Sequence, residues 1–324
     1  MPALRKPDDR VVALLCADIH LSHNAPTARS AEPDWYAAME RSLKELGELA
    51  AFHLAPILFA GDLFESWKSP PELINFALDV LPTMYAIAGQ HDLPHHNQGE
   101  IHKSAYQTLI KAGRITSLRE RRPEPIHRDE LTDIRVWSCG FPWGSEIKSP
   151  GYFSSPIDSK GLPLQQDLVI AVIHDFCWMP GYTYPGAPAA KELSVLGSKL
   201  NGYDVAVFGD NHSHFSSKVG DCNVWNCGCL IRRKKDERKY KPTVGLLYSD
   251  GHIEPHFLDT SEDKWLDEEV SEIGQDFEGL GEFLSELGEL DADSLDFKEA
   301  VKRYLREHEV RELTRKILIE GMGE

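Results

Sequence analysis

The sequence has no long apolar run, and this absence limits where we expect the protein to work. No stretch of the 324 residues approaches the roughly 18 apolar residues that a membrane-spanning helix needs. The first residues are charged and lead directly into an apolar, strand-like segment, which is unlike a secretory signal peptide. We therefore expect a cytoplasmic protein without a membrane segment.

Cysteine is sparse, and a second closely spaced cysteine pair is missing. The six cysteines are Cys16, Cys139, Cys177, Cys222, Cys227 and Cys229. Most lie in or beside apolar runs, which favours buried thiols in a reducing compartment. Cys222, Cys227 and Cys229 could instead form a zinc site, although the paired spacing of such motifs is incomplete.

An excess of basic residues, which many nucleic-acid-binding proteins have, is also absent. The net charge is -17. Residues 254–324 hold 22 acidic and 8 basic residues, so most of the excess belongs to this C-terminal part. The acidity argues against DNA contact by residues 254–324. It says little against DNA contact by the preceding residues, where bound cations would offset carboxylates.

What the sequence does contain is a series of short apolar runs, each followed by a polar cluster. The runs and clusters are 11–17 with Asp18-Ile19-His20, 57–60 with Gly61-Asp62, 84–88 with Gly89-Gln90-His91-Asp92, 168–173 with His174-Asp175, and 205–208 with Gly209-Asp210-Asn211-His212. Such runs are typical of buried strands. Amphipathic helices are predicted at 35–53 and 70–81. The alternation of strands and helices predicts an α/β fold.

The polar clusters predict a single metal site. Ligands in α/β folds bind where strands end, so clusters at five strand ends point to one place. Imidazoles and carboxylates are the natural ligands of borderline divalent metals, and Asp62 on its tight turn suits a bridging role. Two bridged ions serve in-line displacement at phosphorus. Taken singly, Asp18 or Asp62 could also cap a helix, but the ordered set favours the metal site.

The ordered set resembles the calcineurin-like metallophosphoesterases. The matches are Asp18-Ile19-His20 to DxH, Gly61-Asp62-Leu63-Phe64-Glu65 to GDxxD/E, Gly89-Gln90-His91-Asp92 to GNHD/E, His174 to the solitary histidine, and Gly209-Asp210-Asn211-His212 to GHxH. Within the superfamily, the segment 61–64 followed by Pro70-Pro71, and the segment 227–232, look like compact, phage-type members of the SbcD-type DNA nucleases. The resemblance covers residues 11–250.

This resemblance implies a fold and a set of roles. The fold would be a sandwich of two mixed β-sheets flanked by helices over residues 1–260, followed by an acidic helical region over 261–324. The site would hold two divalent ions, with Mn²⁺ preferred and Mg²⁺ or Fe²⁺ as alternatives. One ligand would bridge the two ions, and three further ligands would bind each ion. The implied roles are Asp18, His20 and His212 on the first ion, Asp62 as the bridge, Gln90, His174 and Asp210 on the second ion, and His91 with Asp92 in catalysis. His91 would face the leaving oxygen as an electrophile or general acid.

Two positions depart from the family pattern. Gln90 stands where the family has asparagine, and Asp210 stands where it has histidine. We interpret both as a retuned second site that favours Mn or Mg over softer ions. A slipped alignment would make His212 and His214 the ligand pair. We prefer Asp210 and His212, because residues 204–209 match the strand-then-glycine pattern without a gap.

The sequence contains candidate contacts for nucleic acid. Arg232, Arg233 and Lys234 begin a basic run that is predicted to touch phosphates, although a solvated hairpin explains it equally well. His95, His96 and His102 on a predicted loop could touch a nucleic-acid strand, although exposed loop histidines are commoner. Trp143, Tyr152 and Phe153 could stack on bases. The aromatic residues could also simply be buried.

The resemblance therefore implies a metal-dependent DNA exonuclease, with endonuclease action as an addition, in DNA repair or recombination. It also implies an SbcC-type coiled-coil ATPase as partner, docked on an amphipathic helix predicted at 297–319, and a homodimer. Two alternatives stay open at this point. One is a phosphatase or phosphodiesterase acting on a small nucleotide, and the other is a non-catalytic scaffold that binds DNA or an ATPase.

Overall fold

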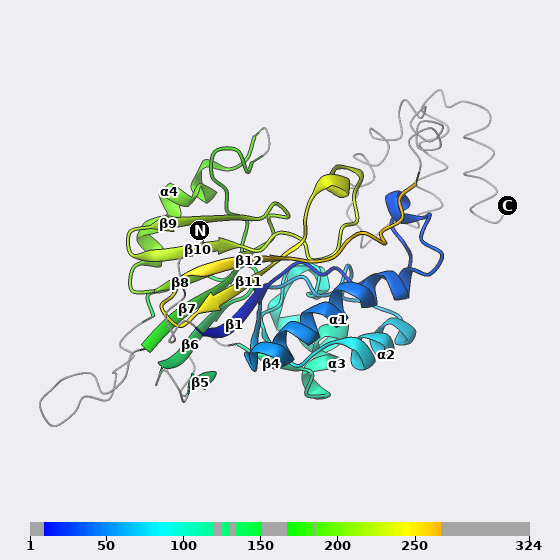
Figure 1. The fold of residues 1–324 in the computed structure, drawn as a ribbon, viewed down its shortest axis with the longest axis horizontal. Coiled ribbons are helices and arrows are strands. Elements are labelled where there is room, and N and C mark those ends of the chain that lie inside the picture. The colour runs from blue at the N-terminus through cyan, green and yellow to red at the C-terminus, as the bar shows by residue number, and fades with distance from the viewer. Residues whose placement is uncertain (1–9, 119–124, 130–133, 151–166, 184–185, 267–324) are drawn as a thin grey trace, which may run out of the picture. The chain divides into compact units, whose positions relative to one another are not determined.

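The computed structural model describes residues 10–118, 125–129, 134–150, 167–183 and 186–266 (Figure 1). The first compact unit of the chain ends at Trp265. The predicted helix at 297–319, Tyr152 and Phe153 lie outside the described residues, and the predicted domain boundary at 260/261 stays a prediction. Each helix within the described ranges is too short or too polar to cross a membrane.

The first sheet contains the first three predicted strands. Its order is β12-β11-β1-β2-β3-β4. The strands are β1 (Val11–Cys16), β2 (Ile57–Phe59), β3 (Met84–Ala86), β4 (Ile115–Ser117), β11 (Thr243–Tyr248) and β12 (Ile253–Phe257). Strands β1 to β4 run parallel, whereas β11 lies antiparallel to β1 and to β12. The parallel strands therefore end at the same edge of the sheet.

Helices cover the outer face of this sheet (Figure 1). They are α1 (Trp35–His53), α2 (Pro71–Val80) and α3 (Ala105–Lys111). The carboxylate of Asp34 caps α1 by accepting from the amide of Ala37 at 3.0 Å, and Pro71 begins α2 in the first turn, where proline fits. The predicted helices at 35–53 and 70–81 are confirmed.

The second sheet has the order β5-β6-β7-β8-β10-β9. Its strands are β5 (His127–Asp129), β6 (Ile134–Phe141), β7 (Asp167–His174), β8 (Val205–Gly209), β9 (Phe215–Val219) and β10 (Cys222–Asn226). Strands β6, β7, β8 and β10 run parallel, with antiparallel strands at both edges. Helix α4 (Leu193–Leu196) packs on the outer face of this sheet.

Short 3-10 helices connect these elements. They are η1 (Thr27–Arg29), η2 (Pro94–His96), η3 (Gln98–Lys103), η4 (Ala189–Lys191), η5 (Gly197–Leu200) and η6 (Lys235–Lys239). Helices η1 and η6 contain Arg29 and Glu237, which contact the surroundings of the site described below, and η2 follows His91.

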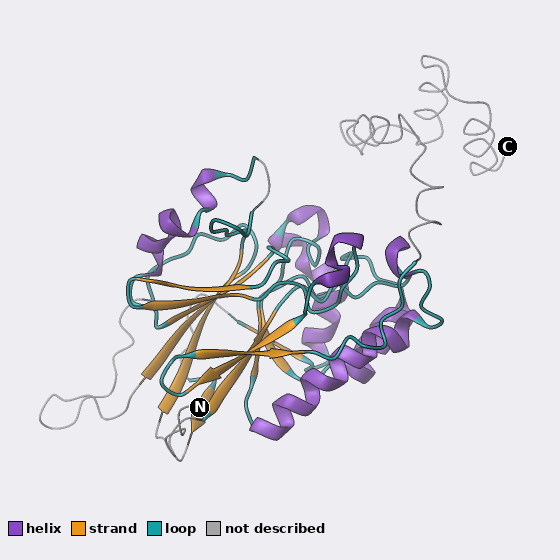
Figure 2. Cartoon of the chain, turned by 45° about the horizontal axis from the view of Figure 1, so that its top comes forward, coloured by secondary structure: helices purple, strands orange, loops and turns teal. Residues whose placement is uncertain are grey.

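An apolar core joins the two sheets (Figure 2). Val12 and Leu15 of β1 share it with Val136, Val172 and Val207 of the second sheet, and all five side chains are fully buried. The predicted α/β fold, a sandwich of two mixed sheets flanked by helices, is confirmed. Because β1, β2, β3, β7 and β8 all end beside this core, the polar clusters that follow them can meet.

Candidate metal centre

The backbone after the strands is strained where the predicted ligands lie. Asp18, His20, Asp62 and Asp210 have positive φ angles of 53°, 51°, 58° and 84°. Residues other than glycine rarely adopt this left-handed region, and it persists mainly where the surrounding structure enforces it, often at functional sites. Here the amide of Asp18 donates to the carbonyl of Gly61, and that of His20 to Asp62, both at 3.0 Å.

Two glycines allow these loops to approach one another closely. A Cβ atom on Gly61, whose φ is 95°, would overlap the ring of His174. A Cβ atom on Gly89 would overlap the carboxylate of Asp62. The glycines of the second and third polar clusters are therefore required by the close packing of the ligands themselves.

The first predicted ligand set converges on one point. The Nε2 atoms of His20 and His212 are 3.1 Å apart, and Oδ1 of Asp18 lies 3.8 Å and 4.0 Å from them. Ligand atoms on one ion, at bond lengths of roughly 2.0–2.1 Å, lie about 3 Å apart at right angles and up to about 4 Å apart at wide angles. The spacing of the three side chains therefore fits a single divalent ion.

The second set lies beside the first. Nε2 of His174 is 2.6 Å from Oε1 of Gln90 and 3.3 Å from Oδ2 of Asp62. The amide group of Gln90 donates to Oδ1 of Asp210 at 2.6 Å, and the backbone amide of Asp210 donates to the Asp18 carboxylate. The two residues that depart from the family pattern, Gln90 and Asp210, are thus direct neighbours.

Asp62 lies between the two sets. Its Oδ1 accepts a hydrogen bond from the backbone amide of His91 at 2.9 Å. Its Oδ2 is buried without a hydrogen bond, 3.7 Å from Nε2 of His20 and 3.3 Å from Nε2 of His174. A buried carboxylate oxygen without a partner is costly, and a divalent cation would satisfy it. This oxygen is the observation in the fold that best fits a bridging ligand.

The imidazoles of the site share one orientation. Each directs Nδ1 away from the centre toward an oxygen, which can only accept, so Nδ1 carries a proton and Nε2 faces inward. The pairs are His174 with the Ala60 carbonyl at 2.5 Å, His91 with the Glu65 carbonyl at 2.8 Å, His20 with Glu65 Oε2 at 3.0 Å, and His212 with Glu237 Oε1 at 3.3 Å. This arrangement directs the Nε2 atoms toward the centre. Nε2 of His174 also faces Oε1 of Gln90, so His174 would release its Nε2 proton to bind a cation.

The charges of the site favour cations. Burial raises the pKa of Asp18 to about 7. Although burial opposes a charged imidazole, the nearby carboxylates, Asp62 above all, raise the pKa of His174 to about 10. Both shifts reduce the negative charge that is collected here, as divalent cations would also do. Burial lowers the pKa of His20 to about 4, so this imidazole is neutral and can bind a metal at neutral pH.

The structure distinguishes between the two candidate ligand pairs after β8. Nδ1 of His214 donates to the carbonyl of Asn226 at 2.8 Å, and its ring packs on Trp225 with centroids 4.1 Å apart. His214 is therefore directed away from the centre. His212 lies in the first ligand set, and Oδ1 of Asp210 accepts from Gln90, but Asp210 belongs to none of the described groups that are close enough to hold a metal, so its role as a ligand stays a prediction.

Asp92, which was predicted to act in catalysis, has a different role in the structure. Its side chain is fully buried, and its two oxygens accept from the backbone amides of Leu63, Phe64 and Gly89 at 3.0–3.2 Å. Burial, together with the neighbouring Asp62, raises the pKa of Asp92 to about 7. We correct the prediction accordingly: Asp92 cannot touch a substrate, and it positions the loops that carry Asp62 and His91.

We expect Asp92→Ala to lower the free energy of unfolding by roughly 3 kcal/mol or more, since each buried amide left without an acceptor costs about 1–3 kcal/mol. Urea unfolding followed by circular dichroism measures this loss. Asp92→Asn keeps one acceptor oxygen and is expected to lose less. Equal stability of Asp92→Ala and the unaltered protein would contradict the positioning role.

The predicted phosphate contacts also need correction. All five donors of the Arg232 guanidinium are used within the protein, by Asp263 and the carbonyls of Arg238, Tyr240 and Thr260, and the side chain is buried. Arg232 is therefore a structural residue. Arg233 is mostly buried against Glu65, whereas Lys234 is exposed.

Sequence reasoning missed two carboxylates of the site. Glu65 was quoted only as part of a motif, and nothing in the sequence near Glu237 indicates that it contacts His212. Burial disfavours the ionised form of Glu237. The contacts of Glu237 with His212 and two backbone amides outweigh the effect of burial and lower the pKa of Glu237 to about 2. Glu237 lies in the first turn of η6, far from His212 in sequence, so only the fold reveals the contact.

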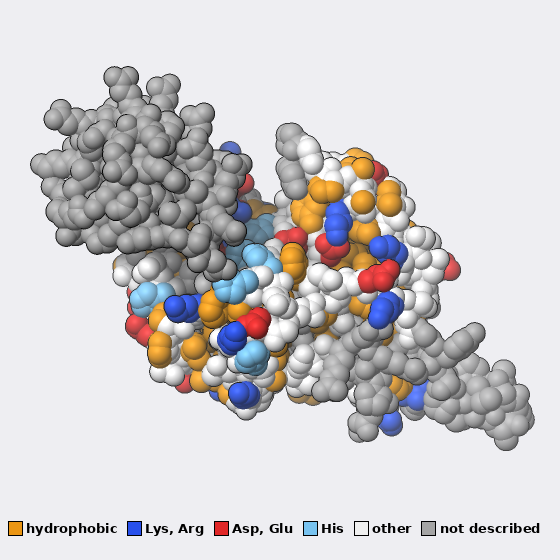
Figure 3. All heavy atoms as spheres, turned by 180° about the vertical axis from the view of Figure 1, so that it is seen from behind, with side chains coloured by type: hydrophobic (Ala, Val, Ile, Leu, Met, Phe, Trp, Pro, Cys, Tyr) orange, Lys and Arg blue, Asp and Glu red, His pale blue; other side chains and the backbone are white. Residues whose placement is uncertain are grey.

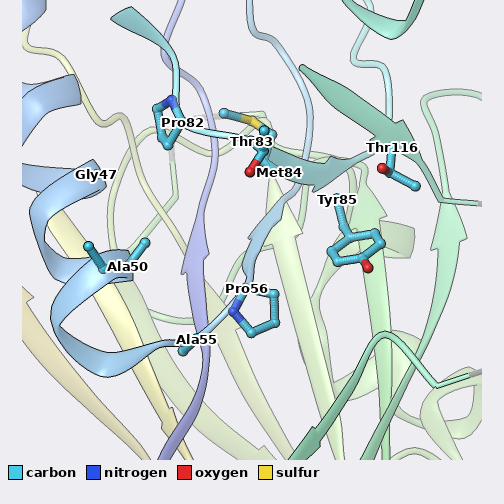
Figure 4. A pocket seen from close by; sticks show the side chains of 10 residues that line it. Gly47, Ala50, Ala55, Pro56, Pro82, Thr83, Met84, Tyr85 and Thr116 are labelled. Atoms are coloured by element: carbon cyan, nitrogen blue, oxygen red, sulfur yellow. The ribbon is translucent and has the colours of Figure 1, made fainter. Parts of the chain in front are cut away.

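The predicted zinc site of three cysteines does not form among the described residues. All six cysteines are buried and free. Cys222 and Cys227 belong to none of the groups that are close enough to hold a metal, whereas Cys229 forms one with His212 and Glu237, which shares His212 with the first ligand set. A separate pocket, lined by Gly47, Pro56 and Met84 among others, lies at the opposite, amino-terminal ends of β2 and β3 (Figure 4). Histidine side chains gather near the middle of one face of the molecule (Figure 3).

Comparison with known proteins gives weak similarities only. No protein-family model and no curated protein sequence matches the chain. A calcineurin-like phosphoesterase from Bacillus subtilis is 15% identical, with a TM-score of 0.41 over 81% of this chain and 89% of that chain. A dimetal phosphatase from Danio rerio is 13% identical, with a TM-score of 0.42 over 77% of this chain and 99% of that chain. A putative 5'-nucleotidase from Staphylococcus aureus is 12% identical, with a TM-score of 0.44 over 81% of this chain and 56% of that chain.

Proposed function

We propose that the protein is a metal-dependent phosphodiesterase that cleaves DNA. The observation that carries this proposal is the buried Oδ2 of Asp62, which has no hydrogen bond and lies between Nε2 of His20 and Nε2 of His174. Two divalent cations held there would activate a water and offset the charge of a phosphate in an in-line displacement. Mn²⁺ is the expected ion, because oxygen ligands from Gln90 and Asp210 suit it on the second site.

His91 is the residue that we assign to the leaving group. Its imidazole is 39% exposed, whereas those of His20 and His174 are buried, and its ring centroid is 4.9 Å from that of His20. Because Nδ1 donates to the carbonyl of Glu65, Nε2 is the atom that is available to a substrate. In its protonated form Nε2 can donate a proton to the departing oxygen.

An exposed basic segment beside the centre supports a polyanionic substrate. Lys234, Lys235, Arg238 and Lys239 are exposed. The backbone amide of Lys234 donates to Glu237, the carboxylate that holds His212. Positive charge at this place would neutralise DNA phosphates that flank the cleaved bond.

Aromatic and imidazole rings in the loops near the second and third polar clusters support binding of bases. The ring of His95 is 6.0 Å from that of Trp67, and the ring of His96 is 5.3 Å from that of Trp143. His95 and His96 both have positive φ angles, so the loop after His91 is strained. The amide of Trp143 donates to the carbonyl of Ala88, just before the third polar cluster. Such rings can stack on unpaired bases.

The proposal is tested with purified protein and Mn²⁺ on linear duplex DNA, hairpin DNA, a nucleoside monophosphate and bis(p-nitrophenyl) phosphate. We expect cleavage of DNA and of the small diester, and loss of both on chelation. Cleavage of the small substrates alone would refute the nuclease and favour a nucleotide phosphatase or phosphodiesterase. Bound metal without any cleavage would favour a scaffold. The fragment pattern of end-labelled DNA separates exonuclease from endonuclease action.

We expect the double variant Lys234→Ala with Lys235→Ala to raise KM for duplex DNA and to leave hydrolysis of the small diester unchanged. Each lost phosphate contact lowers the slope of affinity against salt concentration by about 1 in a double-logarithmic plot. KM measured at several salt concentrations checks this. The matched control is Lys111→Ala with Lys199→Ala, which removes the same charge from exposed positions on α3 and η5. An equal effect of both double variants would refute a local contact.

A further inference from the structure

We propose that Arg233 joins the two carboxylates that orient His20 and His212, and thereby sets the geometry of the first metal site. This inference rests on the metal centre proposed above. It concerns residues that do not bind the metal, so Arg233, Glu65 and Glu237 are positioning residues. Together we call Arg233, Glu65 and Glu237 the clasp.

Arg233 contacts both carboxylates, by two different groups. Its Nη1 donates to Oε2 of Glu65 at 2.5 Å, and its backbone amide donates to Oε2 of Glu237 at 2.6 Å. The side chain is only 13% exposed, so water competes little with these bonds. One residue therefore determines the position of both acids.

Each carboxylate in turn holds one imidazole. The same Oε2 of Glu65 is 3.0 Å from Nδ1 of His20, and Oε1 of Glu237 is 3.3 Å from Nδ1 of His212. Glu237 accepts a hydrogen bond from Nδ1 of His212, whereas Glu65 contacts Nδ1 of His20 by charge and proximity, without an aligned hydrogen bond. Both contacts favour the proton on Nδ1, and the two Nε2 atoms meet 3.1 Å apart. Carboxylates behind histidine ligands fix the tautomer and the orientation of the ring.

The guanidinium of Arg233 also holds the carboxylate of Glu65 beside His20. The side chain of Glu65 is 39% exposed, and Nη1 of Arg233 donates to the same oxygen that lies against His20. Without the guanidinium, Glu65 would face the buried His20 alone and would be free to turn toward solvent. His20 would then lose the group that fixes its tautomer.

A buried network holds the clasp in place from behind. Arg29 donates to the backbone carbonyl of Arg232 at 2.6 Å, and both side chains pair with Asp263, at 2.8 Å and 2.7 Å. The backbone immediately before Arg233 is thus anchored to η1 and to the segment around Asp263. This anchoring explains why Arg232 and Arg233, although adjacent, face different partners.

The two halves of the clasp can be tested separately. Arg233→Ala removes the side-chain bond to Glu65 and keeps the backbone amide, whereas Glu237→Ala removes the acid behind His212. Two readouts apply: the number and affinity of bound Mn²⁺ ions by calorimetric titration, and the His20 and His212 tautomers in metal-free protein by long-range ¹⁵N NMR. Arg128→Ala, at an exposed position on β5, is the matched control.

We expect the neutral Nδ1-H and Nε2-H tautomers of His20 to mix in Arg233→Ala. We expect the same for His212 in Glu237→Ala. Each variant is expected to weaken the same one of two Mn²⁺ sites by roughly 10–100-fold. Arg233→Lys keeps a cation beside Glu65. Its Mn²⁺ affinity and His20 tautomer are expected to lie between those of Arg233→Ala and the unaltered protein. Arg233→Lys also replaces Arg233→Ala as the test variant if Arg233→Ala fails to fold. Unchanged tautomers and unchanged affinities in folded variants would overturn the clasp. Failure of the unaltered protein to bind Mn²⁺ would refute the proposed function instead, while the tautomers of the metal-free variants would still decide the clasp.

Discussion

Asp62→Asn is expected to abolish DNA cleavage, with a fall in kcat on the order of 10³-fold or more. The substitution keeps the size of the side chain but removes the charge of the oxygen between His20 and His174. An amide cannot bridge two cations as a carboxylate does, so we also expect loss of at least one of two bound Mn²⁺ ions. Initial rates on duplex DNA and metal content by mass spectrometry measure both effects.

The control for this substitution is Asp221→Asn, which makes the same chemical change in an exposed turn between β9 and β10. It is expected to retain activity and both ions. Full metal content and rate in Asp62→Asn would remove the bridging role and, with it, the main support for the proposed function. Loss of activity with full metal content would show that Asp62 acts on the reaction and does not hold the ions.

The second large effect is expected for His91→Ala. We expect kcat for DNA to fall by roughly 10²–10⁴-fold, the usual contribution of a general acid, with both metal ions retained. The loss should be much smaller for bis(p-nitrophenyl) phosphate, because its leaving group departs without a proton. The ratio of the two rate losses, measured under the same conditions, therefore reports the role of His91 directly.

His53→Ala, at the C-terminal end of α1, is the matched control and is expected to leave both rates unchanged. An equal loss on both substrates would indicate that His91 acts on the metal or on binding and does not protonate the leaving oxygen. Loss of a metal ion in His91→Ala would place His91 among the ligands. His20, Asp62 and His91 are close enough for such a group, so metal analysis is essential to this experiment.

Several residues of the site have a strained backbone or a buried polar atom without a hydrogen bond. Such features lower stability, and their concentration at one place indicates a functional site. Asp18, His20, Asp62 and Asp210 adopt left-handed backbone conformations without being glycine. Asp62 also keeps a buried oxygen without a hydrogen bond. Each feature costs free energy in the metal-free chain. Cation binding would recover part of this cost, so we expect Mn²⁺ to stabilise the fold as well as to support activity.

The sequence by itself determined strands β1, β2, β3, β7 and β8, the first two helices and the residues that gather at the ends of these strands. Buried parallel strands need unbroken apolar runs, and helix α1 needs a cap and an apolar stripe, so both are encoded among neighbours in sequence. Because the parallel strands of a sheet end at one edge, the convergence of Asp18, Asp62 and His174 also followed from the pattern.

Only the tertiary structure decided which partner each polar side chain takes. It directs His212 toward the centre and His214 toward Asn226, assigns Asp92 to backbone amides, and buries Arg232 against Asp263. It also brings Glu237 to His212, a contact without a signal in the sequence. Apolar patterning is local, whereas a hydrogen bond between distant segments depends on how sheets and loops pack, so these choices exist only in the folded chain.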